Sequence, residues 1–493
     1  MNFNIKKKYF IVAAYLYMVI PVMIFMLTWL KLYVGIPMAV TLAGGLFFIY
    51  KNEYKDSLDT IVLPVKDIVI ITFLLFLWVV LSGSGKLFYE TEDWQVRNAV
   101  FRDLINFKWP VVYEQKGTAL AYYLLQWIVP AGFGKILGWR MGNIALLFWN
   151  FAGVLIVYML LVLLCKNGKK TGLYTIMLIF IFFGGLNQVG RLLEAIFGGA
   201  PPILWGSEDG WLDVVNGYQY SSNYTLLSWV FNQTIVPWIA VPLVLLEKKV
   251  RNYAYIGLLV LPYAPLPFVG IFLMFLVLGI EWCIRTARAG EYRLIFCELF
   301  SIPNVCAVCS VFLCFLAYFS ASKNGMQMGR YETGKFGLEE WAWLTLFFFL
   351  EVGVYALPLW KIYKKEVLFY AICIAMYFIP LIRVGLGRDF CMRAPIGLLF
   401  MLQIYIMQYL VSEKAFTGRC LKTTIVLITL LSLGGYNAVL DLGAKVYEIK
   451  VSDQFPLYKD DIKTLSDKSA DESGNFVAED YKDKFFYKYM AGL

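Results

Sequence analysis

The chain contains no histidine, and only 16% of its 493 residues are charged. Without histidine there is no imidazole to act as a general base, a nucleophile or a metal ligand. Any proton transfer must therefore use Asp, Glu, Lys, Tyr or Cys. Soluble domains typically have about 25% charged residues. The low charged fraction, together with 60% hydrophobic residues, is typical of a protein whose solvent is largely the lipid bilayer.

Metal and cofactor signals are also scarce. Most of the nine cysteines lie inside apolar runs. Cys306 and Cys309 form a CxxC motif without a partner pair, so we interpret them as helix-packing residues and not as a zinc or redox site. The sequence predicts no cofactor and gives no support for a divalent metal.

The apolar residues form long, non-alternating runs of about 16–25 residues, and this pattern predicts membrane-spanning helices. We expect an all-α, polytopic transmembrane helical bundle with about thirteen spans. The predicted spans are residues 9–30, 33–50, 67–83, 141–165, 172–186, 234–247, 253–268, 269–286, 296–319, 341–361, 366–383, 395–411 and 424–440.

Basic residues gather at alternate ends of these spans, which is the positive-inside pattern of a multi-pass plasma membrane protein. It predicts a cytoplasmic N-terminus and an extracytoplasmic C-terminus. It also explains the net charge of +9 without a nucleic-acid partner. The basic sets are Lys6, Lys7 and Lys8; Lys51, Lys55 and Lys66; Lys166, Lys169 and Lys170; Lys248, Lys249 and Arg251; Arg285, Arg288 and Arg293; Lys361, Lys364 and Lys365; and Lys414, Arg419 and Lys422.

The pattern divides the chain into a transmembrane domain, 1–440, and a small extracytoplasmic tail, 441–493. Two large outside loops are expected, 84–139 and 187–233. Segment 119–137 is apolar enough to span, which would invert every later loop. Because Pro130, Gly132 and Gly134 interrupt it and Gly138 follows it, we interpret it as an interfacial or re-entrant helix.

The first outside loop contains the acidic cluster Glu90, Glu92 and Asp93. If 93–105 is helical, Asp93 and Arg97 are four residues apart on one face. Such a pair keeps the carboxylate ionised, as a general base requires. The alternative is a solvated amphipathic helix on the membrane surface, with its charges facing water.

A second charged stretch, 383–393, contains Arg383, Arg388 and Arg393 around Asp389. Arginine is rare on outside loops, and its planar guanidinium suits phosphate. The stretch therefore predicts an anion site. The alternative is that these arginines bind outer-leaflet headgroups or pair with Asp389.

The second outside loop and the next span supply further candidates. Asp209, Trp211, Tyr220 and Gln233 combine a carboxylate, an amide and aromatic rings, which is how proteins hold sugars, but an interfacial aromatic belt accounts for the rings equally well. Glu351 lies in the middle of a predicted span, where a carboxylate is a functional candidate by default, and no role is assigned to it.

The sequences TEDW (91–94), KWPVVYEQKGTALAYYLLQWIVPAGFGK (108–135) and GRDFCMRAPIG (387–397) resemble stretches of the C-type superfamily of membrane glycosyltransferases (GT-C). The resemblance covers roughly 67–440 in layout. Members carry an acidic residue in the first large outside loop, followed by membrane-parallel helices. Here two additional spans precede the span that leads into that loop.

The resemblance implies an inverting enzyme that takes a sugar from a polyprenyl-phosphate carrier and gives it to a lipid or glycan acceptor outside the cytoplasm. It implies Asp93 as the general base, with Glu92 as the alternate, and Arg388 and Arg393 on the donor phosphate. We add Arg383 and Arg97 to the candidate phosphate ligands. Membrane lipids are further expected partners.

Two other functions stay open. One is a flippase or other transporter of a lipid-linked saccharide, and the other is a surface-polysaccharide polymerase or ligase. Transporters often have internal repeats and polar groups at the membrane midplane. This sequence has no repeat, and its charges gather at one face, which favours the glycosyltransferase.

Overall fold

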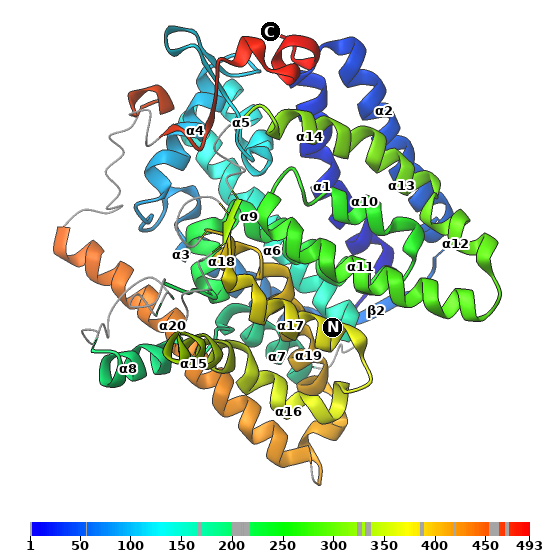
Figure 1. Cartoon of the computed structure of the whole chain (residues 1–493), viewed down its shortest axis with the longest axis vertical. Helices are drawn as coiled ribbons and strands as arrows, with labels where there is room; N and C mark the ends of the chain where they lie inside the picture. Colours follow the sequence, from blue (N-terminus) through cyan, green and yellow to red (C-terminus); the bar gives the residue numbers. More distant parts are fainter. Residues whose placement is uncertain are drawn as a thin grey trace.

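The computed structural model describes residues 2–55, 57–165, 170–199, 209, 211, 217–322, 328–330, 337–384, 389–418, 420–452, 463–468 and 473–493. The protein is a helical bundle with a few short strands (Figure 1). Its helices are α1 (Lys7–Trp29), α2 (Leu32–Ile49), α3 (Val65–Leu81), α4 (Trp94–Asn106), α5 (Leu125–Leu137), α6 (Trp139–Cys165), α7 (Lys170–Phe182), α8 (Asn187–Phe197), α9 (Asn223–Glu247), α10 (Tyr253–Leu258), α11 (Pro265–Arg288), α12 (Tyr292–Leu299), α13 (Ile302–Ala307), α14 (Leu313–Phe319), α15 (Leu338–Phe348), α16 (Val354–Tyr363), α17 (Val367–Phe378), α18 (Asp389–Arg393), α19 (Ile396–Val411) and α20 (Cys420–Ser452).

Ten helical segments of the described chain are long and apolar enough to cross a membrane, which confirms a polytopic all-α bundle. They are Lys7–Trp29, Leu32–Tyr54, Trp139–Cys165, Lys170–Phe197, Asn223–Glu247, Pro265–Arg288, Tyr292–Phe319, Leu338–Tyr363, Asp389–Val411 and Cys420–Val451. Two other predicted spans correspond to shorter apolar helices, α3 with 17 residues and Val367–Leu381.

The predicted span 253–268 is wrong. Helix α10 ends at Leu258 after six residues, and a turn follows. Pro262, Pro265 and Pro267 interrupt the apolar run, and proline lacks the N–H that a helix interior needs. Pro265 instead begins α11, where a missing N–H costs nothing.

The second outside loop is shorter than predicted. Helix α9 begins at Asn223 and not near residue 234. Ser222 caps it, since its hydroxyl accepts a hydrogen bond from the Thr225 N–H at 3.3 Å. Gln233 therefore lies inside a helix, near a kink at Val230 (φ −135, ψ 36).

The first outside loop folds into helices α4 and α5 and the short strands β3 (Val112–Tyr113) and β4 (Thr118–Leu120). Segment 119–137 contains the end of β4 and one helix, α5, with 13 residues. At 1.5 Å per residue this helix is about 20 Å long, whereas the hydrocarbon core is about 30 Å thick. Its length suits the interfacial or re-entrant interpretation.

The predicted boundary at residue 440 falls inside α20, which continues to Ser452. The C-terminal segment then packs on the first loop, because β7 (Val477–Glu479) pairs with β4. Tyr487 donates a hydrogen bond to the Leu120 carbonyl oxygen at 2.7 Å. In Figure 1 this red segment lies beside the cyan helices of the first loop.

The two ends of α1 define two sides of the bundle. At its start, strand β1 (Asn2–Lys6) pairs with β2 (Thr60–Pro64). At its other end, Leu30 forms a bridge with Ala491 of the C-terminal segment. Twenty-three helical residues separate these ends by about 35 Å. The N-terminal strand and the C-terminal segment therefore lie at opposite ends of α1 (Figure 1).

Several predicted basic ends do share one side. Lys7 pairs with Asp59 at 3.6 Å, Lys249 pairs with Glu53, and Arg251 pairs with Glu298. These contacts join residues 7, 53, 59, 249, 251 and 298 on the side of the N-terminal strand. We call it the basic side, and the side of the first loop and the C-terminal segment the loop side.

Candidate active site

The acidic stretch of the first loop is anchored through its tryptophan. The Trp94 indole N–H donates a hydrogen bond to the Ser228 carbonyl oxygen at 2.8 Å, and its ring stacks on Phe231 with centroids 4.7 Å apart. The kink at Val230 disturbs the helical hydrogen bonds of α9 nearby. Trp94 thus supplies a hydrogen-bond donor to the Ser228 carbonyl oxygen next to the kink. The same contact holds the first turn of α4 in place.

Asp93 and Arg97 form the predicted pair. Asp93 directly precedes α4, and its Oδ2 lies 2.9 Å from Arg97 Nη2. The Asp93 side chain is 49% exposed, whereas that of Arg97 is 5% exposed. The Nη1 atom of Arg97 is buried and has no hydrogen-bond partner among the described residues. In this pair, the Asp93 carboxylate is accessible to solvent. The Arg97 guanidinium is buried and can still donate a hydrogen bond through Nη1.

The basic stretch contributes a similar pair. In α18, Arg393 Nη2 lies 3.1 Å from Asp389 Oδ1. The Arg393 side chain is 10% exposed and that of Asp389 is 30% exposed. The Nε of Arg393 is buried without a hydrogen-bond partner in the described part of the chain. This unpaired donor costs free energy unless an acceptor reaches it.

The fold brings the two pairs together. The Arg393 guanidinium lies within electrostatic range of the Asp93 carboxylate, although the two residues are about three hundred positions apart. Tyr122, in the loop before α5, lies within range of both Arg97 and Arg393. Burial raises the pKa of Tyr122 well above its ordinary value, and the two guanidinium groups act in the opposite direction. We call Asp93, Arg97, Tyr122, Asp389 and Arg393 the loop-side site.

The other predicted charged residues have different positions. Glu92 is exposed beside Asp93. Arg383 is exposed on β6 (Ile382–Val384), which pairs with β5 (Met328–Arg330). Arg388 lies outside the described residues. Of the four predicted phosphate ligands, Arg97 and Arg393 therefore belong to the loop-side site, each within electrostatic range of Tyr122.

The predicted sugar platform is not open in this structure. Trp211 and Tyr220 are each 1% exposed, and both rings pack against Phe347. The Trp211 indole N–H donates to Glu351 Oε1 at 2.9 Å, which gives the intramembrane carboxylate a partner. Asp209 accepts a hydrogen bond from the Ser222 N–H at 2.6 Å. Asp209, Trp211 and Tyr220 thus hold the second loop against the bundle.

Gln233 lies deep in the protein beside Asn232. Both side chains are buried, and none of their amide nitrogen and oxygen atoms has a hydrogen-bond partner among the described residues. Buried amides of this kind usually bind ordered water or a ligand. Gln233 thus has free hydrogen-bonding capacity, but in a helix interior and not in a loop.

Sequence reasoning missed a charged pair on α20. Lys445 Nζ lies 3.9 Å from Asp441 Oδ2, and the two residues are 0% and 1% exposed. Lys445 also donates a hydrogen bond to Ser228 Oγ at 2.6 Å. Ser228 thus connects the pair to Trp94, next to Asp93. The four-residue spacing of Asp441 and Lys445 was the signal in the sequence. Both residues, however, lie in the segment that was predicted to be the C-terminal tail.

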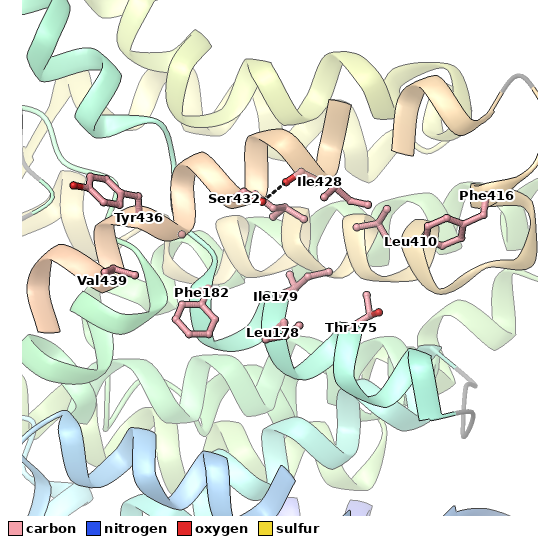
Figure 2. Close-up of a pocket in the computed structure, with 12 residues that line it drawn as sticks. Thr175, Leu178, Ile179, Phe182, Leu410, Phe416, Ile428, Ser432, Tyr436 and Val439 are labelled. Atoms are coloured by element: carbon pink, nitrogen blue, oxygen red, sulfur yellow. Dashed lines mark hydrogen bonds between the residues drawn. The ribbon is translucent and has the colours of Figure 1, made fainter. Parts of the chain in front are cut away.

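One cavity of the described chain is lined mainly by apolar side chains. It has a volume of about 480 Å³ and lies between α7 and α20 (Figure 2). Its Ser432 hydroxyl already donates to the Ile428 carbonyl oxygen at 2.9 Å, and that of Thr175 donates to the Thr171 carbonyl oxygen at 2.9 Å. The hydroxyl protons of Ser432 and Thr175 are therefore engaged, and no charged side chain of the described residues lines this cavity.

Comparison of the chain with protein-family models, with curated proteins and with solved structures gives no match. The loop-side site therefore has to be interpreted from its own geometry. Within the described ranges, no three Cys, Asp or Glu side chains are grouped as a metal site would require.

Proposed function

We propose that the protein is a membrane glycosyltransferase that moves a sugar from a polyprenyl-phosphate carrier to a lipid or glycan acceptor at the cell surface. One observation carries the proposal: an accessible carboxylate, Asp93, lies within electrostatic range of a buried guanidinium, Arg393. A carboxylate beside an anion site is the minimum that transfer from a phosphate carrier needs.

In the proposed reaction, an acceptor hydroxyl oxygen bonds to the anomeric carbon of the donor sugar. The bond between that carbon and the carrier phosphate oxygen breaks at the same time, and the configuration inverts. The hydroxyl proton passes to the Asp93 carboxylate, and the polyprenyl phosphate leaves with one more negative charge. Glu92, exposed next to Asp93, is the alternate base.

The two buried guanidinium groups suit the charge that develops on the leaving phosphate. Arg97 and Arg393 each keep a buried N–H donor without a partner among the described residues. Charge-assisted hydrogen bonds from such groups act most strongly where water is excluded. Arg388, which belongs to the same basic stretch of the sequence as Arg393, is a further phosphate ligand in this proposal.

The proposal places the loop side outside the cytoplasm, at the plasma membrane. The basic side, where Lys7, Lys249 and Arg251 form ion pairs, is then cytoplasmic, as the positive-inside pattern predicts. The donor would reach the site from the outer leaflet.

One observation favours a transporter of a lipid-linked saccharide as the second candidate. Glu351 and the Asp441–Lys445 pair are buried within candidate spans, and ionisable groups at such positions often mark transport pathways. A polysaccharide polymerase or ligase would use the same loop-side site with another lipid-linked donor.

Reconstituted proteoliposomes separate these functions. We expect sugar from a polyprenyl-phosphate-linked donor to appear on an added acceptor, and Asp93→Asn to lower the rate by about 10²–10⁴-fold, the usual contribution of a general base. Glu114→Gln, an exposed acid of the same loop, is the matched control. Movement of the intact donor across the bilayer without transfer would instead support the transporter.

A further inference from the structure

A second cavity, of about 370 Å³, lies on the basic side, where α9, α11, α16, α17 and α19 meet. Its volume is within the range of small-molecule sites. The floor is apolar and the rim is polar. Leu278 belongs to the apolar floor, and the rim has Lys248, Glu281, Arg285 and Glu366.

The position of this cavity separates it from the loop-side site. Lys248 follows the last residue of α9 and precedes Lys249, which pairs with Glu53 on the basic side. The apolar floor comes from helices that belong to candidate spans. The cavity therefore lies at the membrane edge, with its floor toward the hydrocarbon region.

The rim carries two positive and two negative side chains. Glu281 and Arg285 pair with each other. Lys248 and Glu366 are exposed, and neither forms an ion pair with a described residue. Tyr405 lies within electrostatic range of both Glu281 and Glu366, so the two carboxylates approach the same part of the cavity.

Aromatic residues complete the wall. Tyr253, Trp282, Tyr363 and Tyr405 line the cavity, and the Tyr363 and Tyr405 rings pack with centroids 4.3 Å apart. Tyr and Trp prefer the depth of lipid headgroups. An apolar floor, an aromatic wall and a rim with both signs of charge match an amphipathic ligand that is itself zwitterionic.

We propose that this cavity binds a phospholipid with a primary-amine headgroup. The phosphate lies near Lys248 and Arg285, the ammonium group donates hydrogen bonds to Glu366, and an acyl chain follows the apolar floor. A purely anionic headgroup would leave Glu366 facing negative charge. A quaternary ammonium group has no N–H to donate to the carboxylate.

Delipidated protein in detergent, titrated with phosphatidylethanolamine and read by native mass spectrometry, tests the proposal. We expect saturable binding of one lipid, and about tenfold weaker binding for Glu366→Gln and for Lys248→Gln, the effect of one charge-assisted hydrogen bond. Leu278→Trp, which fills the floor, should weaken binding as well. Glu291→Gln and Lys365→Gln, exposed outside the cavity, should leave it unchanged.

Phosphatidylcholine and phosphatidylglycerol are the comparison lipids, and their binding is measured in the same way. Weaker binding of both lipids supports recognition of the primary amine and of the zwitterion. Equal binding of all three lipids, or unchanged binding by the Glu366 and Lys248 variants, would overturn the proposal. The cavity lies on the basic side, away from the loop-side site. A negative result for lipid binding would therefore not bear on the glycosyltransferase proposal, which is tested by sugar transfer.

Discussion

Gly270→Ala should disturb the loop-side site through a backbone contact. An added Cβ at Gly270 of α11 would lie 2.1 Å from the Ala394 carbonyl oxygen. Real Cβ atoms keep at least 3.0 Å, so α11 and the turn after α18 must separate by about 0.9 Å. Ala394 directly follows Arg393, so this movement displaces the guanidinium.

The expected cost has two parts. Overpacking of a close contact lowers the free energy of unfolding by about 1–3 kcal/mol. A shift of about 1 Å at a catalytic group can lower the rate by about 10²-fold. Thermal unfolding in detergent measures the first effect, and sugar transfer by the reconstituted protein measures the second.

Gly279→Ala, on the same helix, is the matched control. A Cβ there meets nothing within 4 Å, and alanine is a better helix former than glycine by about 1 kcal/mol. We expect this variant to be at least as stable as the wild type and equally active. If Gly270→Ala matched it in both assays, the close approach of α11 to Ala394 would be refuted.

Two further predictions concern other contacts. Burial raises the pKa of Asp103, whose Oδ2 accepts hydrogen bonds from Tyr113 and from the Leu465 N–H. A raised folded-state pKa stabilises docking of the C-terminal segment below the ordinary value of about 3.9, and this contribution is lost as the pH rises through the raised value. Proteolysis of that segment should show this pH dependence in the wild type but not in Asp103→Asn, and an equal dependence in both would contradict it. Gly434→Ala places a Cβ 2.2 Å from the Gly184 carbonyl oxygen and should lower stability by about 1–3 kcal/mol in thermal unfolding, whereas Gly443→Ala, which meets nothing within 4 Å, should not.

Composition and periodicity could predict the class of fold because the bilayer requires long apolar helices. The Asp93–Arg97 pair could be predicted because four-residue spacing fixes neighbours on a helix. The prediction of a span at 253–268 was wrong because it rested on the length of the apolar run and gave no weight to the prolines in it, which lack the N–H group that a helix interior needs.

The rest of the site depends on tertiary contacts. Nothing local in the sequence indicates that Arg393 approaches Asp93, or that Trp211 and Tyr220 turn inward against Phe347. The Asp441–Lys445 pair was missed because the C-terminal tail was predicted to begin at residue 441, whereas α20 continues to Ser452. Charged residues there are ordinary in a tail but costly inside a bundle.

The most direct test of the central claim is the turnover number of purified Asp93→Asn with a polyprenyl-phosphate-linked sugar, measured beside donor binding. The account predicts turnover lower by about 10²–10⁴-fold, with donor affinity close to that of the wild type, because Asp93 takes the proton and the arginines hold the phosphate. Full turnover in both Asp93→Asn and Glu92→Gln would contradict it.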